Sequence, residues 1–268
     1  MIFSMSSCSI AGSWVYERLD NYLADYFKEF ADFSREQNQE IELISTEFIN
    51  WFSENELIKL KGILEKLKKI NMQNSEKEIS SIYEDAEGIF TRSNFYFKSP
   101  IISFTKKINE VQIGQIGSHF KELREKREKE RSENGYSLIE NYISGFDRIG
   151  IKLRVDQIDE INFKLEDHIE VREEWSNLQG QWIEEFIQLL KYNQSSDYET
   201  KMSAYLDSLE ELGDQKFREK IDKNELLAQR IINFVFKTSN EKQIESFNRS
   251  LDIYLKSINR ILSKRQVN

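Results

Sequence analysis

The chain has almost none of the residues that interrupt helices or cross-link chains. Its 268 residues include one proline, Pro100, one cysteine, Cys8, and ten glycines, well below the roughly 5% proline and 7% glycine of average proteins. A single cysteine excludes an internal disulfide, and two histidines without paired cysteines leave no pattern for structural zinc. The stability of the chain must therefore come from the packing of long helices.

Long apolar runs are also absent from the sequence. No stretch reaches the ~18 consecutive apolar residues that a membrane-spanning helix requires, and charged residues make up 32% of the chain. Because buried parallel strands need continuous apolar segments, this composition favours an all-α fold with a large solvated helix surface.

The charge of the chain is acidic overall, with a net value of −9 and a pI of about 5.1. Nucleic-acid binding draws its affinity from clustered Lys and Arg side chains, so we expect no nucleic-acid partner. The densest basic run, residues 121–131, alternates six basic and four acidic residues at helical spacing. This pattern is typical of a solvated helix face, and contact with an anion or a lipid headgroup is the alternative.

Apolar side chains recur every three or four residues along most of the chain, which is the spacing of amphipathic helices. The pattern predicts helices near residues 14–31, 35–52, 54–70, 76–97, 101–107, 110–131, 136–149, 156–170, 171–191, 197–212, 223–237 and 239–264. We therefore predict an all-α fold, an elongated multi-helix bundle. Large rings dominate core burial, so we expect the four tryptophans to anchor the core: Trp14, Trp51, Trp175 and Trp182.

The clearest predicted boundary within the bundle lies at Pro100. Proline disfavours helical conformation in the residue before it, so a helix should end near residue 98 and another should begin after it. We expect a leading segment of residues 1–8, an N-terminal helical subdomain of residues 9–98 and a C-terminal helical subdomain of residues 99–268, either packed as two subdomains or merged in one bundle.

Five segments have the sequence of a capping box, in which the first and fourth side chains each accept a hydrogen bond from the other's backbone amide. They are Ser34–Gln37, Ser75–Glu78, Ser196–Glu199, Thr238–Glu241 and the looser Asn109–Gln112. Each predicts a helix start. The starts do not recur at a fixed spacing, so we do not predict a solenoid.

The motifs that carry most enzyme chemistry are absent from the sequence. Neither His119 nor His168 has glutamate three residues before it, as a carboxylate-bridged metal site in a helical bundle requires. There is no glycine-rich phosphate loop and no GxSxG nucleophile motif. We therefore predict no metal, no cofactor and no enzymatic activity, and the sequence identifies no small-molecule substrate. A deep polar pocket gathering Arg18, Glu56 or His168 with perturbed pKa values would indicate otherwise.

The segment CSIAGSWVYERLDNYLADYFKEFADF, which begins at Cys8, contains the most distinctive motif of the chain. It resembles the start of an uncharacterised family of Gram-negative lipoproteins, a domain of unknown function whose members open with a lipobox cysteine and a motif close to S-x-x-VYNRLDWL. The residues that match directly are Val15, Tyr16, Arg18, Leu19 and Asp20. The segment WFSENELIKL is similar to the family's second helix, and Trp51, Glu56 and Leu57 are kept.

The resemblance implies that Cys8 is a site of lipid attachment, through which the chain would contact a lipid bilayer. Each buried acyl CH₂ contributes about 0.8 kcal/mol, so the family's triple acylation would anchor the chain stably without a transmembrane helix. The seven residues before Cys8 lack the basic and apolar regions of a secretory signal. We expect them to be the remnant of a lipoprotein signal whose true start lies upstream, and loss of export is the alternative explanation.

Two functional hypotheses follow from these observations. The first is a lipid-anchored cell-envelope protein, at the outer membrane and facing the periplasm, that binds or scaffolds an unknown envelope protein. Its candidate partner surface is Tyr16, Arg18 and Asp20, for which helix packing and local ion pairing are the alternative role. The second is a soluble cytoplasmic helical protein that oligomerises or binds a partner helix through an amphipathic segment.

Overall fold

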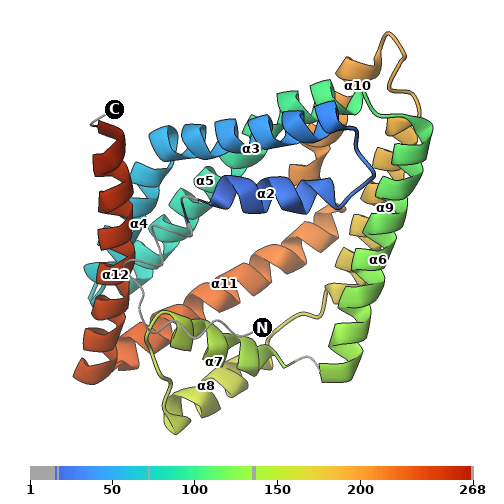
Figure 1. The fold of residues 1–268 in the computed structure, drawn as a ribbon. Helices are drawn as coiled ribbons and strands as arrows, with labels where there is room; N and C mark the ends of the chain where they lie inside the picture. The colour runs from blue at the N-terminus through green and yellow to red at the C-terminus, as the bar shows by residue number, and fades with distance from the viewer. Residues whose placement is uncertain (1–15, 17, 72, 135–136, 267–268) are drawn as a thin grey trace.

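The computed structural model consists of helices joined by short connections (Figure 1). It describes residues 16, 18–71, 73–134 and 137–266, and over these ranges it contains eleven α-helices, one short 3-10 helix and no strand. The predicted all-α fold is confirmed. The α-helices are α2 Leu19–Lys28, α3 Arg35–Asn55, α4 Leu57–Lys68, α5 Ser75–Thr105, α6 Glu110–Asn134, α7 Leu138–Arg148, α8 Val155–Leu165, α9 Arg172–Leu190, α10 Tyr198–Asp207, α11 Gln215–Thr238 and α12 Glu241–Gln266.

Helix α5 runs without interruption through Pro100, so the predicted helix end before this residue is wrong. Proline inside a helix removes one backbone donor and costs about 3 kcal/mol. However, α5 packs against α3, α4, α10 and α11, and this tertiary packing outweighs the local cost. A domain boundary between residues 98 and 99 would divide a single helix.

The helices run along the edges of an open frame (Figure 1). Helices α6 and α9 pair on one side of the frame, α4 and α12 pair on the opposite side, and α5 packs against α11 between them. The chain exposes 17407 Å², whereas a compact monomer of this mass exposes about 12,000 Å². The fold therefore offers far more surface than a compact globule of the same length.

The two halves of the chain repeat one arrangement of helices. Residues 16–41 and 136–161 align without a gap, 120 positions apart. The identical pairs are Tyr16/Tyr136, Asn21/Asn141, Tyr22/Tyr142, Gln37/Gln157, Glu40/Glu160 and Ile41/Ile161. The helix ends agree with this alignment, because α2 and α7 end at aligned residues and α3 and α8 begin at aligned residues.

The last helices of the two halves also correspond, and each packs on the opposite half. The segments NEVQI, residues 109–113, and NEKQI, residues 240–244, lie 131 positions apart and begin α6 and α12. Helix α6 of the first half packs against α9 of the second, while α12 packs against α4 of the first. The halves therefore exchange their final helices, as the subunits of a domain-swapped dimer do.

A pair of buried glutamines joins the two corresponding helix starts in each half. In the first half, Gln37 on α3 and Gln112 on α6 donate side-chain hydrogen bonds to each other, at 3.1 and 2.7 Å. In the second half, Gln243 on α12 donates to Gln157 on α8 at 2.8 Å. The bond in the opposite direction is not made in the second half, because the Gln157 amide donates instead to the Thr238 hydroxyl at 3.0 Å.

These glutamines also explain which predicted capping boxes form. The boxes beginning at Ser34 and Asn109 are confirmed, with both reciprocal bonds present in each. The boxes predicted at Ser75, Ser196 and Thr238 do not form, because the residues that precede α5, α10 and α12 are Asn74, Asp197 and Asn240. The three helices nevertheless begin within three residues of the predicted starts. The helix starts whose side chains hydrogen-bond to each other have glutamine, and not glutamate, at the fourth position of the capping box.

Candidate functional site

Tyr16, the first described residue of the predicted lipoprotein-like motif, lies at the corner where α2, α3, α4 and α12 meet. Tyr16 packs against Leu57, Ile258 and Ile261, and its hydroxyl lies 2.5 Å from Ser53 Oγ. Tyr16 therefore joins three helices at this corner. Cys8, the predicted lipid-attachment residue, lies outside the described residues.

The structure brings two of the three candidate partner residues into one cavity. Tyr16 and Asp20 line a hollow of about 240 Å³ beside α12. The Asp20 carboxylate accepts hydrogen bonds from the amide of Asn21 at 2.8 Å and from the Thr46 hydroxyl at 3.4 Å. Arg18 is exposed just before α2 and is not among the described residues that line this hollow.

Glu56 links two helices. The sequence suggested it as a possible member of a polar pocket. Its side chain is only 1% exposed, and Arg92 donates to both carboxylate oxygens at 2.8 and 2.7 Å. Lys59 donates at 2.8 Å. The hydrogen bonds from Arg92 are the main reason that the pKa of the Glu56 carboxyl is lowered despite its burial. The charge of Glu56 therefore ties the start of α4 to α5.

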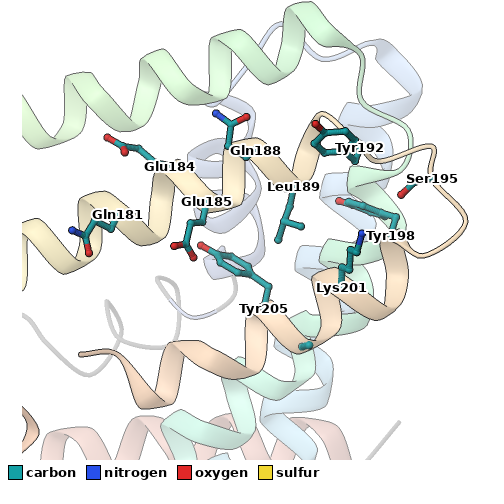
Figure 2. Close-up of a pocket in the computed structure, with 11 residues that line it drawn as sticks. Gln181, Glu184, Glu185, Gln188, Leu189, Tyr192, Ser195, Tyr198, Lys201 and Tyr205 are labelled. Atoms are coloured by element: carbon teal, nitrogen blue, oxygen red, sulfur yellow. The ribbon is translucent and has the colours of Figure 1, made fainter. Parts of the chain in front are cut away.

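The open cleft between α9 and α10 is lined with polar side chains (Figure 2). Glu185 and Tyr205 point toward each other across it, and burial, followed by the charge of Glu185, raises the pKa of Tyr205. The Tyr205 hydroxyl donates to the Trp182 carbonyl, and the buried Tyr198 hydroxyl donates to Thr105 Oγ1 at 2.7 Å. Both hydroxyls are thus protonated donors that hold helices together.

Among the described residues, no cluster of three or more His, Cys, Asp and Glu side chains could hold a metal ion. Within the same ranges, no helix has the length and apolar character needed to cross a membrane.

Two cavities occupy corresponding places in the two halves. The arginine groove, of about 240 Å³, lies between α2, α6 and α9. The apolar groove, of about 420 Å³, lies between α7, α12 and α4, with α5 and α11 alongside. Three aligned pairs line both grooves: Tyr26/Phe146, Phe120/Leu251 and Leu123/Tyr254. In each groove one wall belongs to the other half of the chain, so the helix exchange creates both.

The last helices of the two halves differ at the positions where α6 supplies its arginines, and the aligned residues of α12 do not line the apolar groove. In the arginine groove, α6 supplies Arg124 and Arg127. The aligned residues of α12 are Leu255 and Ile258, which are buried at 9% and 7% exposure. At these aligned positions, the first half of the chain therefore has cationic side chains, and the second half has buried apolar side chains.

Two of the tryptophans form a wall of the arginine groove. Trp175 is 40% exposed, so its predicted core position is wrong, and Trp182 is half-buried. Trp182 stacks on Tyr205 with ring centroids 4.8 Å apart, and its buried indole Nε1 has no hydrogen-bond partner. Sequence reasoning missed the groove because its residues come from both halves, although it noted anion contact as an alternative role for residues 121–131.

No family model, no curated protein sequence and no solved structure matches this chain. The resemblance to the lipoprotein family stays a prediction.

Proposed function

We propose that this protein is a non-enzymatic binding module of the cell envelope, related to the lipoproteins that it resembles, and anchored by a lipid on Cys8 so that it faces the periplasm. The observation that carries the binding role is the pair of corresponding grooves. Ligand sites occupy about 300–1,000 Å³. The apolar groove, at about 420 Å³, lies within this range, and the arginine groove, at about 240 Å³, is slightly smaller.

Tyr16 indicates how an anchored molecule would be oriented. Tyr16 lies eight positions after Cys8, and an extended chain spans at most ~3.6 Å per residue, or about 29 Å in total. A lipid on Cys8 would thus hold the corner of α2, α4 and α12 toward the membrane. Helices α6 and α9 lie on the opposite side of the frame from α4 and α12 (Figure 1). The arginine groove would then face away from the bilayer.

Arg18 and Asp20 would remain beside the anchor in this orientation. Arg18 is exposed and Asp20 is partly exposed, so both could contact a membrane-proximal envelope protein, while Tyr16 supports them by packing.

Acyl labelling tests the anchor directly. The gene with its upstream bases is expressed in a Gram-negative cell that is fed an alkyne-tagged fatty acid, and the wild-type protein is compared with the Cys8→Ser variant. We expect the label and membrane association in the wild type and neither in the variant. An unlabelled wild-type protein in the soluble fraction would contradict the proposed lipid anchor.

The second candidate function is a soluble cytoplasmic protein that self-associates. It is favoured by the exposed area of 17407 Å² and by the helix exchange, because helices that swap between halves could also swap between chains. Light scattering at increasing protein concentration tests it. A constant mass of 32.0 kDa would exclude self-association.

A further inference from the structure

We propose that the arginine groove binds a small organic carboxylate, with an aromatic or short aliphatic body and one carboxylate group. This ligand class rests on the binding role proposed above and does not depend on the lipid anchor. The groove supplies the two kinds of contact that such a ligand needs, an apolar wall and cationic donors.

The apolar wall is aromatic and of limited size. It includes Tyr26, Phe120, Trp175 and Trp182 from three helices. A cavity of about 150 Å³ holds one benzene molecule, whereas drug-sized ligands occupy 300–1,000 Å³. The 240 Å³ of the arginine groove therefore fits one ring with a short chain, or a short aliphatic chain alone.

The cationic donors lie on one face of α6. Arg124 and Arg127 are three residues apart and line the same groove, as neighbouring positions on a helix surface do. A guanidinium offers paired donors that match the two oxygens of a carboxylate. Glu128 is the one acidic residue among the described residues that line the groove, and it lies 4.0 Å from Arg124 Nε, at the limit of an ion pair. Two arginines and one glutamate leave the lining net positive.

Gly180 gives Arg124 its place in the groove. The Arg124 Nη1 atom lies 2.9 Å from the position that a Cβ at residue 180 would take, so the guanidinium rests directly on the backbone of α9. A larger residue would displace it. The ring of Trp182 lines the same wall, and its buried indole Nε1 has no hydrogen-bond partner.

The second half of the chain provides an internal comparison. At the positions of Arg124 and Arg127 it has Leu255 and Ile258, and its groove is apolar. Since both copies fold in the same frame, the arginines are not required to form it. Replacing them with the residues of the other copy therefore tests binding without removing a fold contact that the frame needs.

The test compares two probes on the full chain. 4-Phenylbutyrate is titrated while tryptophan fluorescence and heat of binding are followed, and 4-phenylbutanamide, its neutral isostere, is titrated in parallel. We expect the carboxylate to bind at least tenfold more tightly than the amide. Equal affinity for both probes, or no binding of either at millimolar concentration, would overturn the proposal without bearing on acylation at Cys8.

Variants locate the binding. We expect Arg124→Leu and Arg127→Ile each to weaken 4-phenylbutyrate at least tenfold, and Gly180→Ala to weaken it several-fold. Arg260→Leu, which changes an exposed arginine of α12 outside both grooves, should leave binding unchanged. Unchanged binding in the Arg124→Leu, Arg127→Ile double variant, with its helical circular dichroism intact, would contradict the site. Should that variant unfold, the comparison of the two probes on the wild type still decides the proposal.

Discussion

The side-chain amides of Gln37 and Gln112 hydrogen-bond to each other across the starts of α3 and α6. Each also accepts a hydrogen bond from the backbone amide at the start of its own helix. Each then donates to a carbonyl next to the partner helix, Gln37 to Lys107 and Gln112 to Asp32, both at 3.1 Å. Gln37 and Gln112 are only 8% and 5% exposed. If one of them is removed, water therefore cannot replace the hydrogen bonds that the other loses.

Gln37→Ala should lower the free energy of unfolding by about 2–4 kcal/mol, since it removes a helix cap and takes hydrogen-bond partners from the buried amide of Gln112 and from the Lys107 carbonyl. Urea unfolding measures the change. Gln39→Ala, an exposed residue two positions along the same helix, should change it by less than about 0.5 kcal/mol. Equal losses in the two variants would show that the glutamine pair is unimportant.

Arg92→Ala should destabilise the protein at pH 7, because the Glu56 carboxylate, 1% exposed, loses its main partner. Removing one partner of a buried pair leaves an uncompensated charge, and the loss is limited here because the Arg92 side chain is 43% exposed. Arg35→Ala, at an exposed arginine of α3, is the control and should have little effect.

The Arg92→Ala effect should also depend on pH. The pKa of Glu56 is lowered in the folded protein, mainly by Arg92. Its contribution to stability is therefore complete above its ordinary pKa of 4.5 and is lost as the pH falls through the lower folded value. The difference between wild type and variant should shrink as the pH falls below about 4.5. A difference that stays constant from pH 7 to pH 3 would refute this role of Glu56.

Gly150→Ala should destabilise the fold by about 3 kcal/mol, because the backbone there has φ of +87° and the new Cβ would meet the Ser246 carbonyl oxygen at 2.8 Å. Gly62→Ala, within α4 and with open space around the new Cβ, should instead stabilise by about 0.5–1 kcal/mol. Thermal unfolding distinguishes the two, and opposite shifts in Tm are expected.

Small-angle scattering should give a radius of gyration clearly above the ~18 Å of a compact 268-residue chain, because the helices form an open frame. A value near 18 Å for the monomer would contradict the open arrangement.

The helices could be predicted closely because their signals are local. Amphipathic spacing and the boxes at Ser34 and Asn109 placed α3 and α6 within a few residues. Pro100 misled the prediction because packing of α5 against four helices overrides a local preference. The duplication could have been found from Asn21, Tyr22 and Gln37 recurring 120 positions later.

The arginine groove could not have been predicted in the same way. Arg124 lies in α6 and Trp175 lies in α9. The amino-acid pattern around each residue fits a buried helix and a solvent-exposed helix equally well. Only the packing of α9 against α6 across the two halves shows that they line one cavity. The role of Cys8 as an anchor stays a prediction from the family resemblance.

The exchange of final helices has a consequence for how the chain folds. Because α6 packs beside α9, and α12 packs beside α4, each half buries part of its apolar surface only against the other half. Formation of the native state must wait for contacts between residues far apart in sequence, which slows folding. The two halves should melt in one cooperative transition, and a chain cut between α6 and α7 should yield two fragments that stay bound to each other.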